Sequence, residues 1–233
     1  MNLSQFEYMT FDVYGTLIDW ETGIIHALQP VLDAHGFDWS DADILEAFAR
    51  YETVSQRPYA RYPEVLRRVL RRIGEEHGFQ PSEEELEAFA GSVPDWPAFA
   101  DSAAALQVLK HHIRLGVITN CDDALFAQSN EKLGVDFDII VTAQQAGAYK
   151  PAPEPFELAF DRIGGIRDRL VHVAQSLYHD HEPGKNFGLA TIWINRRSVR
   201  EGFGAAPEAS ATPDLELSDL QSLAHMFEQQ GSP

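Results

Sequence analysis

The amino-acid sequence predicts an α/β fold, in which a small helical cap domain is inserted into a Rossmann-like parallel-sheet core. In the second half of the chain, apolar strand-like runs alternate with helical patterns, as is typical of successive βαβ units. Between about residues 20 and 92 the apolar pattern is helical, with little strand signal. We therefore expect a core domain of residues 1–19 and 97–233 and a cap domain of residues 20–96.

The composition limits the classes of binding partner and the cellular compartment that we expect for this protein. The chain has 233 residues and a formal net charge of −18, which disfavours a nucleic-acid partner because phosphate binding needs basic surface. The single cysteine, Cys121, excludes an internal disulfide framework and fits a reducing compartment. The N-terminus lacks a signal-peptide pattern, and no apolar run is long enough to span a bilayer. We therefore expect a cytoplasmic protein with no membrane partner.

The first predicted strand and turn lie in residues 8–19, YMTFDVYGTLID. An apolar run brings Asp12 to the end of the strand, Gly15 permits a tight turn, and Thr16 follows. A carboxylate at the carboxyl end of a parallel strand, next to a turn rich in free N–H groups, is well placed to act as a nucleophile. The alternative is that Asp12 only caps the turn.

The next block carries helix signals. Ser40 with Asp43, and Ser82 with Glu85, have the spacing of helix N-caps. Between them an apolar stripe repeats at helical spacing. Its members are Tyr62, Val65, Leu66, Val69, Leu70 and Ile73.

After the proline-rich segment 93–101, strands and helices alternate. The expected strands are 114–120, 136–143, 169–175 and 189–195, and the expected helices are 102–112, 123–133 and 153–163. A short strand and a closing helix are expected within 214–227.

Polar residues follow the predicted strands. These are Thr119 and Asn120, then Lys150, then Asp180. Taken singly, each has an ordinary alternative as a helix cap or a solvated side chain. Because the carboxyl ends of parallel strands meet at one edge of a sheet, we expect these residues to lie near Asp12.

The segments FDVYGTLID, ITN, AYKP and HVAQSLYHD, in this order, resemble the motifs of the haloacid dehalogenase superfamily. The resemblance covers nearly the whole chain and implies that Asp12 is a covalent nucleophile. It implies that Thr119 and Lys150 help to bind the substrate anion and the nucleophile, and that Asp180 is the last motif acid. It also implies a homodimer.

Two departures favour one branch of the superfamily. Tyr14 stands where its phosphatases carry a second aspartate as general acid, and tyrosine is a poor proton shuttle at pH 7. Gln175 stands where they tend to carry a magnesium-binding acid. With a tyrosine at this position, the motif is similar to that of the type II (L-2-haloacid) dehalogenases, which work without a metal or another cofactor. A weak metal site at Asp12 and Asp180 stays open.

In that branch the nucleophile attacks the carbon α to a carboxylate, displaces halide with inversion and leaves an ester, which water hydrolyses to a 2-hydroxy acid. We expect Asp12 to attack, Thr16 to position it, and Lys150 to balance the two negative charges in the site. Asp180, paired with Lys150, is the candidate for activating the water.

A small carboxylate substrate is expected to meet a further set of side chains. The substrate-binding candidates are Tyr14, Trp20, Arg50, Thr119, Asn120, Gln175, Ser176 and His179. Arg50 is the candidate cap arginine that anchors halide or carboxylate, with Arg57 and Arg61 as rivals. Trp20 either walls the pocket or packs the cap.

The leading hypothesis is an (S)-2-haloacid dehalogenase. In one alternative, a strained ring amine such as L-azetidine-2-carboxylate is opened, with His179, Tyr178 or an acid recognising the ring nitrogen. The third hypothesis is a small-molecule phosphatase, and a non-enzymatic alternative is a binding protein on the same fold.

Overall fold

The computed structural model describes residues 1–196, 205 and 209–230, and its described strands form one parallel sheet. The spatial order is β3-β2-β1-β4-β5-β6, and every neighbouring pair is parallel. The strands are β1 (Tyr8–Phe11), β2 (Arg114–Thr119), β3 (Ile139–Thr142), β4 (Leu170–Ala174), β5 (Ala190–Ile194) and β6 (Leu215–Leu217). The predicted α/β class with a parallel sheet is confirmed.

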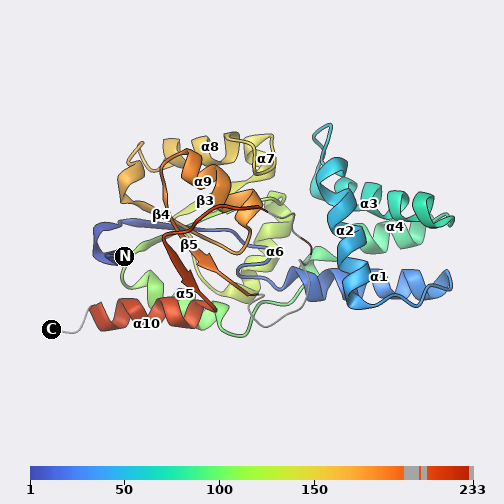
Figure 1. Cartoon of the computed structure of the whole chain (residues 1–233), viewed down its shortest axis with the longest axis horizontal. Coiled ribbons are helices and arrows are strands. Elements are labelled where there is room, and N and C mark those ends of the chain that lie inside the picture. Colours follow the sequence, from blue (N-terminus) through green and yellow to red (C-terminus); the bar gives the residue numbers. More distant parts are fainter. Residues whose placement is uncertain (197–204, 206–208, 231–233) are drawn as a thin grey trace.

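Helices cover both faces of the sheet, as a parallel sheet requires. Figure 1 shows α7, α8 and α9 on one side and α5, α6 and α10 on the other. The first group is α7 (Ala143–Ala146), α8 (Glu154–Arg162) and α9 (Glu182–Asn186), and the second is α5 (Ser102–Lys110), α6 (Asp123–Leu133) and α10 (Leu220–Gln230). Short 3₁₀ turns span Leu3–Gln5, Val93–Asp95 and Arg167–Arg169, and one π turn spans Leu177–His181. Helices therefore cover β1 on both faces, and Asp12, the residue that follows this strand, is buried.

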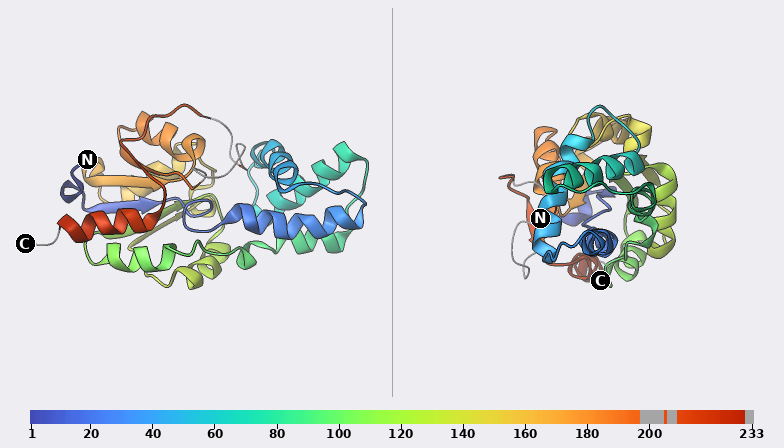
Figure 2. Two further views of the ribbon diagram at one scale, coloured as in Figure 1. Left: turned by 60° about the horizontal axis from the view of Figure 1, so that its bottom comes forward. Right: turned by 90° about the vertical axis from the view of Figure 1, so that its right-hand side faces the viewer.

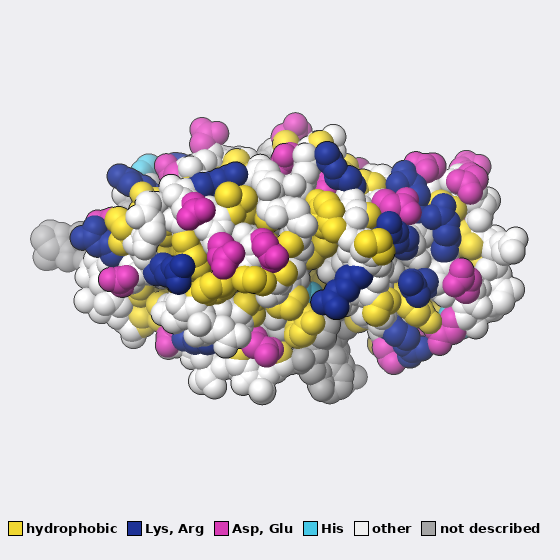
Figure 3. Space-filling model, turned by 90° about the horizontal axis from the view of Figure 1, so that it is seen from above, with side chains coloured by type: hydrophobic (Ala, Val, Ile, Leu, Met, Phe, Trp, Pro, Cys, Tyr) yellow, Lys and Arg dark blue, Asp and Glu magenta, His cyan; other side chains and the backbone are white. Residues whose placement is uncertain are grey.

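Four helices form a separate cluster at one end of the sheet (Figures 1 and 2). They are α1 (Trp20–Ala34), α2 (Asp41–Ser55), α3 (Tyr62–His77) and α4 (Glu83–Ala90). Ser40 and Ser82 are the expected N-caps, and each forms a capping box. The predicted stripe of α3 is its buried face. Acidic and basic side chains are interspersed over the face of this cluster that Figure 3 shows. Arg67 on α3 pairs with Glu87 on α4 at 2.7 Å.

The chain crosses between the sheet and this cluster twice, and the two crossings lie side by side. The N–H of Asp19 donates to the carbonyl of Pro97 at 2.8 Å, and Ile18 forms an antiparallel bridge with Ala98. We propose these crossings as the borders between core and cap. In the part of the chain that the structure describes, no helix is long and apolar enough to cross a membrane.

Candidate active site

Asp12 is held in place by the turn that follows β1. Its N–H donates to the carbonyl of Val173 on β4 at 3.0 Å, which extends the sheet pairing by one residue. The hydroxyl of Thr16 donates to Asp12 Oδ2 at 2.8 Å and accepts from the N–H of Gln175 at 2.9 Å. Gly15 has φ of +104°, where an L side chain is strained. The sequence therefore places a carboxylate in a fixed orientation at the carboxyl edge of the sheet.

Lys150 joins Asp12 to Asp180. Its ammonium donates to Asp12 Oδ1 at 2.9 Å, to Asp180 Oδ1 at 2.6 Å and to the carbonyl of Ile118 at 2.6 Å. The side chain is 1% exposed, and an ammonium has three donors, all of which are engaged here. Lys150 can therefore act on a substrate through its charge, but it has no donor left for a substrate oxygen.

The charges in this cluster shift one another's pKa values. Burial by itself would raise the pKa of Asp180, but the Lys150 charge and the hydrogen bond from His172 hold that pKa well below its ordinary value. Burial raises the pKa of Asp12, and the charge of Lys150 opposes the rise. Burial would lower the pKa of Lys150, but the two carboxylates raise it above its ordinary value, so the ammonium stays charged.

His172 on β4 completes the network and was missed by the sequence analysis. Its Nε2 lies 2.9 Å from Asp180 Oδ1, and its Nδ1 lies 2.9 Å from the hydroxyl of Thr10. The other carboxylate oxygen of Asp180, Oδ2, is buried and has no hydrogen-bond partner among the described residues. The one available signal was a histidine inside an otherwise apolar strand.

Asn120 contacts the main chain of Lys150. Its amide nitrogen donates to the Lys150 carbonyl at 3.0 Å, and its amide oxygen accepts from the Lys150 N–H at 2.7 Å. The side-chain amide therefore positions Lys150 and leaves any contact with substrate to the main-chain N–H of Asn120. Thr119 is buried at the end of β2, and its hydroxyl has no partner among the described residues. Thr119 does not line the cavity beside Asp12.

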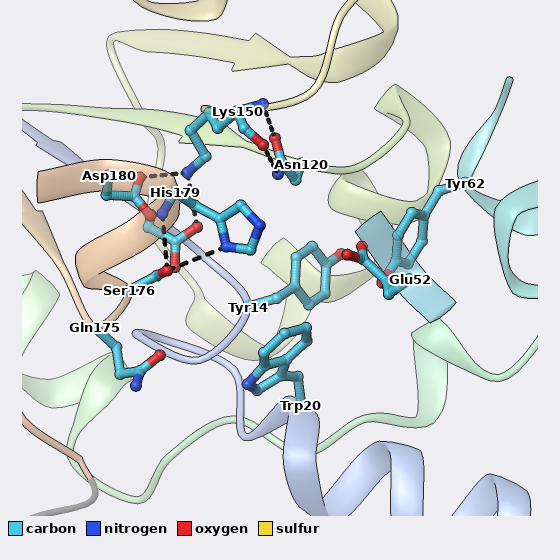
Figure 4. A pocket seen from close by; sticks show the side chains of 11 residues that line it. Tyr14, Trp20, Glu52, Tyr62, Asn120, Lys150, Gln175, Ser176, His179 and Asp180 are labelled. Carbon is cyan, nitrogen blue, oxygen red and sulfur yellow. Dashed lines mark hydrogen bonds and ion pairs between the residues drawn. The ribbon is translucent and has the colours of Figure 1, made fainter. Parts of the chain in front are cut away.

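Asp12 lines a small cavity of about 30 Å³, and Figure 4 shows the side chains around it. It is lined by Asp12, Tyr14, Trp20, Glu52, Tyr62, Asn120, Lys150, Gln175, Ser176, His179 and Asp180. Most of the side chains predicted from the sequence are in this set. Glu52 on α2 and Tyr62 on α3 were missed, and both come from the cap.

Two aromatic residues, Tyr14 and Trp20, line this cavity. The hydroxyl of Tyr14 lies 3.0 Å from Ser129 Oγ, and burial raises the pKa of Tyr14 well above its usual value, so the ring stays neutral. Trp20 lines the cavity and packs edge-on against Phe48 of the cap, with ring centroids 5.9 Å apart. Trp20 therefore takes both of the positions that were considered for it.

The π turn supplies a neutral imidazole. Ser176 Oγ accepts from the N–H of His179 at 3.0 Å and lies 3.1 Å from its Nδ1. Nε2 of His179 has no partner among the described residues. Burial lowers the pKa of His179 to about 4, so the ring is uncharged at pH 7.

Arg50 is not part of this site, and the structure corrects that prediction. Its side chain is 52% exposed and pairs with Glu76 at 2.7 Å and with Glu46 at 3.3 Å. Residues two apart on a helix point about 200° apart, so Glu52 faces the cavity while Arg50 faces outward. Arg57 and Arg61 are also exposed, and none of the described lining residues is an arginine.

The donor set does not fit a magnesium ion. Among the described residues, no group of three or more His, Cys, Asp and Glu side chains is placed to hold a metal. The ammonium of Lys150 occupies the space between Asp12 and Asp180, and Gln175 offers an amide in place of a carboxylate.

The parallel sheet, the helical cap and the buried Asp12–Lys150–Asp180 cluster at the carboxyl edge of the sheet together point to a hydrolase. The sequence model of the haloacid dehalogenase-like hydrolases matches residues 7–188, and the chain belongs to this family. The predicted superfamily is therefore confirmed.

Three relatives show the range of this family. The (S)-2-haloacid dehalogenase of Pseudomonas fluorescens is 24% identical and aligns over 92% of this chain and 93% of its own. The pyrimidine 5'-nucleotidase YjjG of Escherichia coli is 25% identical over 93% and 98%, respectively. The L-2-haloacid dehalogenase of Xanthobacter autotrophicus, solved with chloropropionic acid covalently bound, has the same fold. Its TM-score is 0.77 at 19% identity, covering 98% of this chain and 100% of that one.

Proposed function

We propose that the chain is a metal-independent hydrolase that uses Asp12 to displace a leaving group from the carbon α to a carboxylate. The best-supported substrate class is the (S)-2-haloacids, which would give a 2-hydroxy acid and halide. The observation that carries this proposal is the buried Asp12 carboxylate, oriented by Thr16 and Lys150 at the base of a small cavity. Neutral Tyr14 and Gln175 at the two phosphatase acid positions argue against phosphoryl transfer.

In the first step, a carboxylate oxygen of Asp12 attacks C2 of the substrate. The C–O bond forms as the C–halogen bond breaks, and halide leaves with the bonding electrons. The product is a neutral ester of Asp12 with inverted configuration at C2. The charge of Lys150 holds Asp12 and the substrate carboxylate in one site, which their mutual repulsion would otherwise oppose.

In the second step, water attacks the ester carbonyl carbon of Asp12. Oδ2 of Asp180 has a vacant acceptor position and can take a hydrogen bond from that water. The C–O bond to the substrate breaks on the acyl side, the 2-oxygen receives a proton, and a second proton leaves to solvent. Asp12 is regenerated as a carboxylate with one oxygen from water.

A second candidate substrate is a strained ring amine such as L-azetidine-2-carboxylate. Two features of the cavity favour it. Nε2 of His179 has no partner among the described residues, and the cap contributes the carboxyl of Glu52 to the lining and none of the three candidate arginines. The same attack at C2 would break the C2–N bond, and the ring nitrogen would stay in the product as a primary amine.

Mass spectrometry in ¹⁸O water tests both candidates. EDTA-treated enzyme would be incubated with (S)-2-chloropropionate, with L-azetidine-2-carboxylate and with p-nitrophenyl phosphate, and Asp12→Asn would serve as control. Label in the peptide that contains Asp12 after several turnovers, together with loss of either carboxylate, supports the proposal. Magnesium-dependent phosphate release without label, or no label with any substrate, would overturn it.

A further inference from the structure

Glu52 is a buried carboxyl for which the mechanism above has no use. It lies on α2, is 5% exposed and lines the same cavity as Asp12. Its Oε1 accepts a hydrogen bond from the amide of Gln56 at 2.6 Å. Among the described residues, it makes no ion pair. In Figure 4, Glu52 and Tyr62 lie on one side of the view and Lys150 with Asp180 on the other, with Tyr14 between them.

The charges that line the cavity do not balance. Asp12 and Asp180 share one cation, Lys150, and Glu52 adds a third acid to the same cavity. A buried carboxylate without a cation is unfavourable, and a like charge nearby makes it more so. A 2-haloalkanoate would bring a further negative charge and leave Glu52 without a partner. A substrate that also carries a cation would neutralise it.

We propose that Glu52 is the counter-ion for a protonated amine of the substrate. The site then selects 2-substituted carboxylates that carry an ammonium group, either free or in a ring. The inference rests on the proposed reaction at Asp12 and names the substrate class for it. An ammonium donates strong charge-assisted hydrogen bonds to a carboxylate, and a methyl group of the same size donates none.

The ionisation of Glu52 agrees with this role. Burial raises the pKa of Glu52 to about 7, so a bound cation would pull a proton off it near neutral pH. The surrounding titratable groups stay neutral there, because burial raises their pKa values. These groups are Tyr62 on α3, Tyr14 and Cys121 on the core, and Tyr149 next to Lys150.

A matched pair of substrates tests the inference. (S)-2-chloro-4-aminobutanoate and (S)-2-chloropentanoate differ by an ammonium group in place of a methyl group. We expect the wild type to prefer the amine by at least about tenfold in kcat/KM, and Glu52→Gln to lose that preference through KM. Glu46→Gln, at an exposed acid on the same helix, is the matched control and should keep the preference. Equal kcat/KM values in the wild type, or an unchanged ratio in Glu52→Gln, would overturn the inference.

Binding to a nucleophile-free protein separates the two proposals. In Asp12→Asn, titration calorimetry would compare 4-amino-2-hydroxybutanoate with 2-hydroxypentanoate at pH 6.5 in two buffers of different ionisation enthalpy. We expect the amine to bind at least about tenfold more tightly with proton release, and both effects to vanish on adding Glu52→Gln. If this pattern holds while the wild type turns over no substrate, the reaction is wrong and the counter-ion role stands. If the two ligands bind equally, the counter-ion role is wrong even if chloride is released.

Discussion

Nε2 of His172 and the ammonium of Lys150 bind the same oxygen of Asp180, at 2.9 and 2.6 Å. Because a carboxylate only accepts, the nitrogen of His172 that faces Asp180 carries a proton. Both donors engage Oδ1, which fixes the carboxylate plane and leaves Oδ2 without a partner among the described residues. The pair therefore holds the Asp180 carboxylate in one orientation, and in the proposed mechanism its Oδ2 accepts from the attacking water.

Replacing His172 should slow the second step more than the first. For His172→Gln we expect kcat to fall about 10- to 100-fold, the usual effect of losing a hydrogen bond to a charged group. The aspartyl ester should then accumulate, and intact-protein mass spectrometry during turnover would detect it. If kcat falls with no ester present, His172 supports the fold rather than the water.

Lys150→Met should remove activity and stability together. The substitution leaves Asp12 and Asp180 as adjacent buried acids without a cation, and breaking such a pair is destabilising by about 3–5 kcal/mol. The pKa of Asp12 should rise, because the charge that opposes its rise is gone. Urea unfolding and single-turnover assays would measure both effects. Activity within tenfold of the wild type would contradict the mechanism.

Glu52 should make stability depend on pH. The native protein keeps Glu52 protonated up to about pH 7, whereas the unfolded chain ionises it near 4.5. Between these values the native state binds more protons, so Glu52 makes stability fall as pH rises, by about 3 kcal/mol in all. In urea unfolding at pH 5, 6, 7 and 8, the unfolding free energy of Glu52→Gln should therefore increase relative to that of the wild type as the pH rises. Parallel stability curves would contradict the shifted pKa.

Arg50→Ala should leave catalysis unchanged. The side chain is half exposed and pairs only with surface acids among the described residues, and solvent screens such pairs so that they contribute little to stability. We expect kcat/KM within about twofold of the wild type and a comparably small change in unfolding free energy. A tenfold loss in kcat/KM for the 2-chloro acids would return Arg50 to the list of substrate anchors.

Local patterns were enough to predict the fold and the core half of the site. The apolar run before Asp12, the glycine turn and the alternation of strands and helices each depend on near neighbours in sequence. Given a parallel sheet, strand ends meet at one edge, which brings Lys150 and Asp180 to Asp12. The helix N-caps at Ser40 and Ser82 are equally local, and both were predicted.

The cap half of the site needed the three-dimensional packing. Which face of α2 meets the core depends on how all four cap helices dock, and a shift of two positions exchanges Arg50 for Glu52. Side-chain contacts between residues far apart in the sequence could not be predicted from local patterns either. The amide of Asn120 turns to the main chain of Lys150, thirty residues away, and His172 is an isolated polar residue in an apolar strand.

Because the chain crossings at Asp19 and Pro97 are adjacent, all four cap helices lie on one continuous segment of the chain. A single continuous segment can be exchanged there without interrupting any strand of the sheet. Asp12, Lys150 and Asp180 stay behind, while Glu52 and Tyr62 travel with the insert. On the proposed function, exchanging that segment would keep the reacting groups and replace the cap side chains that meet the substrate.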